Sequence, residues 1–240
     1  MGSAAGRDVR TGGDVSHGLV VGKFYPPHAG HHHLIDTAAA ACERLTVVVA
    51  VSPLESIPIV LRAAWLRERH SQPHVEIVAV VDDIPVDYDS DTTWAAHVAV
   101  FRAAAGGPVD VVFNSEEYGP ELAGRLDAVH VPGDPARERF PVSGTAVCAD
   151  PVARWEWLSP AVRAHLARRV VVVGAESSGT TTLARALASH YAMSARFAEE
   201  LERRRLPHVV VTGPHAERLY EATEAIDALI AAGWTFTYPR

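Results

Sequence analysis

Short apolar runs alternate with longer helical stretches along most of the chain. The apolar runs are continuous and rich in valine, which is typical of parallel strands covered on both faces, and they predict strands at 18–21, 45–52, 75–84, 110–117 and 127–134. The stretches between them are rich in alanine and leucine and predict helices at 31–45, 60–70 and 92–105. Strand–helix alternation of this kind predicts an α/β fold with a doubly wound parallel sheet.

A second unit begins late in the chain. The segment "ARRVVVVGAESSGTTTLARALASHY", residues 167–191, has the order of strand, glycine-rich loop and helix that is typical of a phosphate-binding unit. The segment before it, 150–166, predicts a helical connector. We therefore place a boundary near Arg168 and expect a disordered tail, a first domain and a small second α/β domain over residues 1–16, 17–167 and 168–240.

The composition argues against several classes of partner. A formal charge of -7 at pH 7 does not suit nucleic-acid binding, which needs a basic surface. Cys42 and Cys148 are the 2 cysteines of the chain, too few and too far apart for a disulfide framework or a CxxC metal site. No apolar run reaches the ~20 residues of a membrane span. The glycine-rich start also lacks the apolar core of a signal peptide, so we expect a cytoplasmic protein with neither nucleic acid nor membrane as a partner.

Histidines gather directly after the first predicted strand. His28, His31, His32 and His33 follow a loop that contains two adjacent prolines. Three interpretations are open at this point: a metal site, an inert histidine-rich surface or a phosphate site. A helix could offer two of the imidazoles to Zn²⁺, but the neighbouring sequence suggests no third ligand, and we assign no metal ligand.

The residues around the histidines favour the phosphate site. Gly22 lets the chain turn off the strand, Pro26–Pro27 stiffen the loop, and Gly30 allows close backbone approach where the helix begins. A helix N-terminus presents free N–H groups and the positive end of its dipole to an anion. His28 and His31 can then donate hydrogen bonds to a phosphate whose charge grows during phosphoryl or nucleotidyl transfer.

This loop resembles a known signature. Gly22-x-Phe24-x-Pro26-x-His28-x-Gly30-His31 is similar to the GxFxPxHxGH motif of the HxGH nucleotidyltransferase superfamily, whose domains are Rossmann-like. His32 and His33 lie outside the signature, and we expect them to be helix surface.

The second motif of that superfamily, ISxTxxR, is matched in part. Val142, Ser143 and Thr145 fit it, and their hydroxyls can bind triphosphate oxygens and cap a helix. Cys148 stands where the motif has its arginine. A thiol cannot replace the planar, permanently charged fork of an arginine, and we expect Cys148 to be a small buried residue.

The order of several segments narrows the resemblance. "GKFYPPHAGHHHLI", "FNSEEYGPELA", "PVSGTAVCADPVARWEWLSPAVR" and "RRVVVVGAESSG" follow one another as in NadR-type bifunctional proteins, which join a nicotinamide mononucleotide (NMN) adenylyltransferase to a ribosylnicotinamide kinase. The resemblance covers nearly the whole chain after residue 17. It implies that ATP, with Mg²⁺, and NMN are the substrates and that NAD⁺ and pyrophosphate are the products.

The resemblance also implies the roles of individual residues. The ATP phosphates would be held by His28 and His31 together with Gly22, Lys23, Phe24, Tyr25, Pro26, Gly30, Ser143 and Thr145. Trp94 matches a family tryptophan near the nicotinamide, and an indole suits a cationic ring, although a core aromatic is equally consistent with the sequence. Further substrate-binding candidates at the end of a predicted strand are Asn114, Ser115 and Glu116. Arg62 matches a family arginine, although an arginine in a helix is more commonly exposed.

The second domain carries a degenerate P-loop. Gly174, Ser178, Gly179 and Thr181 fit the pattern GxxxxGK[ST], but Thr180 occupies the lysine position. A threonine has neither the charge nor the reach to contact the β- and γ-phosphates. The middle of a kinase lobe is not evident in the 168–240 segment either, so we expect a truncated P-loop subdomain without kinase activity.

The sequence thus favours an NMN adenylyltransferase, in which His31 stabilises the transition state and His28 orients the triphosphate. Two alternatives stay open: a non-catalytic sensor that binds NAD and ATP, and an adenylyl- or cytidylyltransferase for another acceptor. The oligomeric state is also open, a homo-oligomer being one alternative.

Overall fold

The chain folds into two compact units. The structure, a computed structural model, describes residues 15–167, 170, 172, 174, 178–191, 209, 211 and 213–237. Residues up to Leu166, joined by those from Phe236 onward, form the first unit, and 167–235 form the second.

A parallel sheet forms the centre of the first unit. Its five strands run in the order β3-β2-β1-β4-β5, and all four neighbouring pairs are parallel. The strands are β1 (Val15–Gly22), β2 (Cys42–Val51), β3 (Val75–Val81), β4 (Val111–Asn114) and β5 (Val129–Pro132). All five predicted strands are therefore present, and their carboxyl ends share one edge, where α/β sheets bind ligands.

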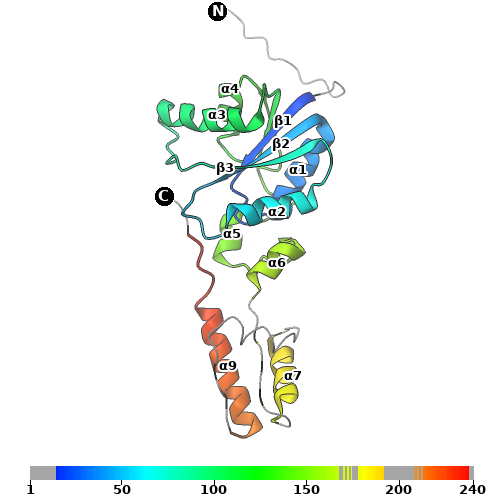
Figure 1. Cartoon of the computed structure of the whole chain (residues 1–240), viewed down its shortest axis with the longest axis vertical. Coiled ribbons are helices and arrows are strands. Elements are labelled where there is room, and N and C mark those ends of the chain that lie inside the picture. The colour runs from blue at the N-terminus through cyan, green and yellow to red at the C-terminus, as the bar shows by residue number, and fades with distance from the viewer. Residues whose placement is uncertain are drawn as a thin grey trace, which may run out of the picture. The chain divides into compact units, whose positions relative to one another are not determined.

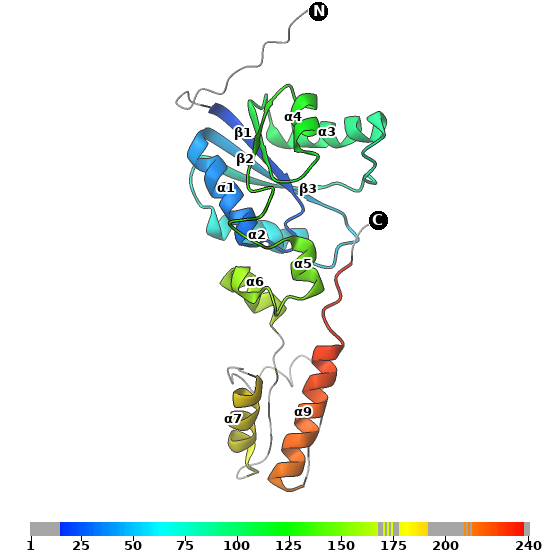
Figure 2. The same ribbon diagram turned by 180° about the vertical axis from the view of Figure 1, so that it is seen from behind.

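Helices cover both faces of the sheet, as the continuous apolar strands predicted. Figures 1 and 2 show α1 and α2 on one face and α3 and α4 on the other. Their bounds are Ala29–Ala41, Ile59–Arg69, Asp91–Ala105 and Gly119–Arg125. Adjacent residues of β1 supply both cores: Val20 packs with Ile35 and Leu66, and Leu19 with Phe101 and Leu122. The doubly wound fold is confirmed.

Short helices complete the first unit. After β5 come α5 (Gly144–Ala149), a 3-10 turn at Trp155–Trp157 and α6 (Pro160–Leu166), so the predicted connector is helical in part. The helix α4 has no counterpart among the predicted elements. No helix in the described ranges is long and apolar enough to cross a membrane.

In the described part of the second unit, two helices pack side by side (Figure 1). They are α7 (Thr180–Tyr191) and α9 (His215–Ala231). Leu183 and Leu187 of α7 bury their side chains against Ala222 and Ile226 of α9. The strand predicted before the P-loop lies mostly outside the described residues, as does most of the segment between these helices.

Candidate nucleotide-binding site

The loop between β1 and α1 is built by close packing around Phe24. Its ring is 1% exposed, and a Cβ on Gly22 would lie 3.3 Å from two of its atoms. The absence of a side chain at Gly22 therefore allows this close approach. The residue with a left-handed backbone conformation is Phe24 itself, with φ of 48°. Positive φ at a bulky residue stores strain, and such strain is concentrated at functional sites.

His28 and His31 stack at the start of α1. Their ring centroids are 3.7 Å apart with an interplanar angle of 25°, and Phe24 packs edge-on against His31 at 4.9 Å. A Cβ on Gly30 would lie 3.3 Å from two atoms of the His28 ring, which confirms the predicted need for close approach at that glycine. The two signature histidines thus form one unit with the loop.

Both imidazoles are neutral at physiological pH. Burial, with smaller contributions from His32 and Arg137, lowers the pKa of His28 from 6.5 to about 3. Burial and the neighbouring histidines likewise hold the pKa of His31 well below 6.5. The Nδ1 atoms of both rings are buried without a hydrogen-bond partner among the described residues. Buried polar atoms normally have partners, so these two nitrogens point to a ligand or water.

The N-terminus of α1 is free to bind an anion. His28 is its N-cap residue, and the described structure shows neither a side-chain cap nor an acidic residue in the first turn. The first N–H groups of a helix have no partner within it and carry the positive end of the dipole. A phosphate at this point would receive those N–H groups beside the two histidines.

The second motif packs directly on the first loop. Ser143 caps α5 as predicted, its Oγ accepting a hydrogen bond from the backbone N–H of Ala146 at 3.1 Å. A Cβ on Gly144 would lie 3.1 Å from the carbonyl oxygen of Tyr25. The Sγ of Cys148, which is buried as predicted, donates to the same oxygen at 3.3 Å. Thr145 is exposed in the first turn of α5.

Arg62 lies beneath the loop, and an exposed helix position is ruled out because its side chain is 0% exposed. Its Nη1 lies 2.6 Å from Oε2 of Glu55 and donates to the carbonyl oxygen of Lys23 at 2.8 Å. Its guanidinium also stands 5.0 Å from the ring centroid of Tyr25. These contacts fix the backbone of the loop. The part that Glu55 plays could not be predicted, because Glu55 belongs to no motif of the sequence.

Tyr25 ties distant segments to the same loop. Its hydroxyl lies 2.7 Å from Oγ of Ser56 and accepts from the backbone N–H of Ser56 at 3.1 Å. It also accepts from the backbone N–H of Thr237 at 3.1 Å, and the ring of Phe236 packs edge-on against it. Lys23 is the exposed member of the loop, with its Nζ 3.5 Å from Oε1 of Glu55.

The expectation that His32 belongs to the helix surface is wrong. His32 is 8% exposed, and its Nδ1 lies 2.9 Å from Nε2 of His70, which ends α2. The other nitrogen of His70 stands 3.2 Å from Oδ1 of Asp36. This chain of polar groups joins α1 to α2 directly behind the signature. His33 is half-buried and packs on Phe140, with ring centroids 5.0 Å apart.

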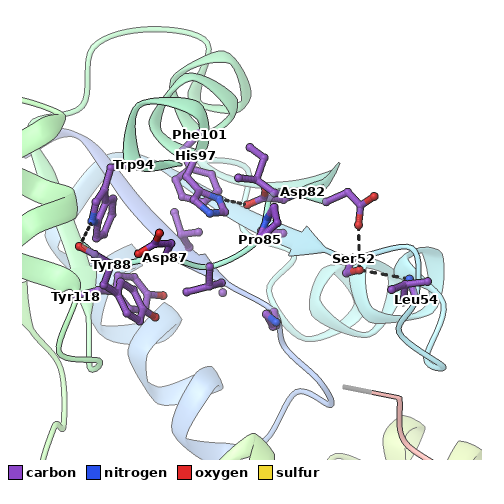
Figure 3. Close-up of a pocket in the computed structure, with 17 residues that line it drawn as sticks. Ser52, Leu54, Asp82, Pro85, Asp87, Tyr88, Trp94, His97, Phe101 and Tyr118 are labelled. Atoms are coloured by element: carbon purple, nitrogen blue, oxygen red, sulfur yellow. Dashed lines mark hydrogen bonds and ion pairs between the residues drawn. The ribbon is translucent and has the colours of Figure 1, made fainter. Parts of the chain in front are cut away.

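A cavity of about 340 Å³ opens beside the loop (Figure 3). Trp94, Tyr88 and Tyr118 gather in one part of it. Trp94 is 7% exposed, donates from Nε1 to the carbonyl oxygen of Tyr88 at 3.1 Å and has Arg125 5.3 Å from its ring centroid. The two interpretations of Trp94 therefore converge, because it is a core aromatic that also lines a cavity.

Carboxylates line the same cavity. Asp82, Asp83 and Asp87 all border it, and Lys23 is the lysine at its edge. Nδ1 of His97 lies 2.8 Å from Oδ2 of Asp82, which fixes how that imidazole is oriented. An aromatic cavity with acidic walls suits a ligand that carries a flat cationic ring.

The chain is similar to known proteins over most of its length. No protein-family model matches the chain. The trifunctional NAD biosynthesis/regulator protein NadR of Escherichia coli (strain K12) is 30% identical over 192 residues, which are 72% of this chain and 46% of that protein. The protein of the same name from Salmonella typhimurium (strain LT2) is 29% identical over 190 residues, with the same coverage. Over 72% of its length the chain is therefore similar to NadR proteins. It spans about half the length of these curated relatives.

Two solved structures of NadR proteins share the fold of this NadR-like chain. One, in complex with NAD and AMP-PNP, has a TM-score of 0.59 and 21% identity, over 73% of this chain and 53% of that one. The other, in complex with NR, has a TM-score of 0.61 and 22% identity, over 80% of this chain and 56% of that one. At these identities the likeness concerns the α/β architecture.

The end of β4 brings three predicted residues of the NadR-like chain together. Asn114 is 2% exposed, and its Oδ1 accepts from the backbone N–H of Glu116. Oγ of Ser115 accepts from the backbone N–H of Asp134 at 3.2 Å. Glu116 is exposed and pairs with Arg137 at 3.1 Å. All three lie at the carboxyl end of β4, the edge at which α/β sheets generally bind ligands.

The degenerate P-loop of the NadR-like chain is described only from Ser178 onward, apart from Gly174. Gly179 has φ of 79°, and α7 begins at Thr180, followed by Thr181. The guanidinium of Arg218 donates to the carbonyl oxygen of Ser178. The side chain at the lysine position is a threonine, and Arg218 reaches the backbone of the loop from α9.

Proposed function

We propose that this chain is a nucleotidyltransferase that transfers the adenylyl group of ATP to NMN and releases pyrophosphate, forming NAD⁺. The main structural support for this proposal is the neutral, stacked pair of His28 and His31 at the uncapped N-terminus of α1. The similarity to NadR proteins and the aromatic, acidic cavity beside the loop support the same reaction.

The transfer needs positioning and electrostatic stabilisation rather than a covalent intermediate. An oxygen of the NMN phosphate forms a bond to the α-phosphorus of ATP. The bond from that phosphorus to the oxygen bridging to the β-phosphate breaks, and its electron pair leaves with pyrophosphate. The NMN phosphate is already ionised at neutral pH, so no general base is required.

The two signature histidines divide the work. A neutral imidazole carries one N–H donor, and in a buried site such a donor stabilises developing charge more strongly than in water. We assign His31 to the transition state at the α-phosphorus and His28 to the triphosphate. The N–H groups of the first turn of α1 receive the remaining phosphate oxygens.

The cavity is assigned to the acceptor. Its aromatic walls, with Trp94, suit the nicotinamide ring, and the carboxylates of Asp82 and Asp87 complement the positive charge of that ring. Mg²⁺ is assigned to ATP as its companion, since Mg²⁺ usually binds substrate phosphates with few protein ligands.

A non-catalytic NAD and ATP sensor is the second candidate. Two positions that carry a phosphate-binding cation in the motifs hold Cys148 and Thr180 instead. We assign no kinase activity to the second unit on the same ground. Phosphorylation of nicotinamide riboside by ATP above background would contradict that assignment.

An acceptor panel tests the proposal. The full chain is incubated with ATP and Mg²⁺ and, separately, NMN, flavin mononucleotide or phosphopantetheine, and the products are separated by chromatography. Of the three acceptors, we expect only NMN to give a product, the dinucleotide NAD⁺. A product formed only with another acceptor would show that this acceptor, and not NMN, is the substrate. Binding of NMN and ATP without any product would favour the non-catalytic sensor.

A further inference from the structure

The loop from Gly133 to Phe140 is a rigid structure. The carboxylate of Asp134 accepts three backbone hydrogen bonds at 3.0–3.2 Å, from Glu138, Arg139 and Phe140. The carbonyl oxygen of Asp134 accepts a fourth, from the N–H of Arg137 at 3.0 Å. One aspartate therefore organises the whole turn between β5 and α5.

This loop is fixed between the end of β4 and the first turn of α1. A Cβ on Gly133 would lie 2.6 Å from Oγ of Ser115 and 2.7 Å from Cδ1 of Leu34, so a glycine is needed there. At the other end of the loop, Cβ of Phe140 is 3.7 Å from where a Cβ on Gly30 would stand. The loop thus lies against the first turn of α1, at the glycine between the two signature histidines.

Arg137 occupies the turn of this loop in a strained conformation. Its φ is 52°, a region that non-glycine residues enter rarely and that is concentrated at functional sites. Its side chain is 43% exposed and pairs with Glu116, which is 56% exposed. Exposed ion pairs contribute little stability, so an anion can compete with Glu116 for this guanidinium.

The charge of Arg137 reaches the signature histidines. It is among the causes that lower the pKa of both His28 and His31, after burial and the neighbouring histidines. A positive charge that acts on both rings also acts on a phosphate placed between them and the helix N-terminus. No other arginine contributes to the lowered pKa of either ring.

We propose that Arg137 supplies the phosphate-binding guanidinium that the second motif lacks at Cys148. In this arrangement the fork of Arg137 binds the β- and γ-phosphates of ATP, a geometry for which guanidinium is suited. Glu116 holds the side chain in place until the nucleotide arrives. The inference rests on the proposed nucleotide site but is independent of the acceptor and of turnover.

Equilibrium binding of ATP and of AMP to the full chain tests this role. Arg137→Asn removes the charge with a residue that tolerates positive φ, and Arg137→Lys keeps a charge without the fork. Arg139→Asn is the matched control, because Arg139 also donates its backbone N–H to Asp134 and its side chain is exposed. NAD⁺ formation is measured in parallel.

We expect Arg137→Asn to weaken ATP binding by about tenfold to a hundredfold, the loss of one charge-assisted hydrogen bond. AMP binding should be unchanged, Arg137→Lys should be intermediate, and Arg139→Asn should bind as the unmodified chain does. Equal ATP affinity in Arg137→Asn and Arg139→Asn overturns the proposal. A loss of AMP affinity in Arg137→Asn as large as its loss of ATP affinity also overturns it, as does an unmodified chain that binds no ATP. Selective loss of ATP affinity in a chain that makes no NAD⁺ upholds Arg137 and refutes the transferase.

Discussion

The Sγ of Cys148 lies 3.3 Å from the carbonyl oxygen of Tyr25 and donates a hydrogen bond to it. The residue that stands at the arginine position of the second motif is therefore turned toward the backbone of the first motif. It joins α5 to the signature loop from inside the protein. A thiol cannot supply the charged fork of an arginine at this position, whereas its side chain packs the two motifs together.

Replacement of Cys148 tests this packing role. Cys148→Arg places a long charged side chain at a position that is 7% exposed, and overpacking costs about 1–3 kcal/mol. We expect a clearly lower thermal unfolding midpoint. Cys148→Ala is the control, which removes one weak hydrogen bond without adding volume and should lose about 1 kcal/mol or less. If Cys148→Arg were as stable as the unmodified chain, position 148 would not be a tightly packed contact between the two motifs.

The buried histidines make stability depend on pH in a defined window. The pKa of His28 is about 3 in the folded chain against 6.5 ordinarily. Between these values the unfolded chain binds a proton that the folded chain does not, so the free energy of unfolding falls as pH is lowered from 6.5 and is constant above it. One such histidine gives a slope of up to about 1.4 kcal/mol per pH unit.

Urea unfolding from about pH 4.5 to about pH 7.5, which spans the upper end of this window, measures that slope. His28→Asn removes one titrating group and should give a shallower acid limb than the unmodified chain. Parallel limbs for the two proteins would show that His28 is not held neutral by the fold.

The contact between His32 and His70 predicts a coupled pair of substitutions. His32→Leu or His70→Leu alone leaves one buried imidazole nitrogen without its partner at 2.9 Å, which costs about 1–3 kcal/mol. In the double variant both polar partners are gone, so the two losses should not add. A double-mutant cycle in denaturant measures the coupling, and strictly additive losses would argue against a shared buried hydrogen bond.

Trp94 should act on the acceptor and not on ATP. Trp94→Leu removes the aromatic face beside the cavity, so we expect the KM for NMN to rise about two- to thirtyfold, the range of a cation–π contact. The KM for ATP should stay the same. Trp94→Phe, which keeps an aromatic ring, is the matched control. Its KM for NMN should lie between those of the unmodified chain and Trp94→Leu. Equal changes in both KM values for Trp94→Leu would indicate a general loss of structure.

The sequence predicted the sheet well because its strands are buried on both faces. Val20 and Leu19 pack on opposite sides, and that requirement produces a continuous apolar run. The loop between β1 and α1 could be predicted because its residues are local and their spacing is specific. His32 was misplaced, since its burial depends on His70, 38 positions away in the chain. Arg137 belongs to no motif, and its relevance follows only from the folded loop between β5 and α5.

Formation of NAD⁺ from NMN, ATP and Mg²⁺ by the unmodified full chain, with His31→Ala beside it, tests the central claim most directly. We expect NAD⁺ and pyrophosphate in equal amounts from the unmodified chain and a rate about 10²–10³-fold lower from His31→Ala, because one transition-state donor is lost. No NAD⁺ from a chain that binds both substrates, or an equal rate from both proteins, would contradict it.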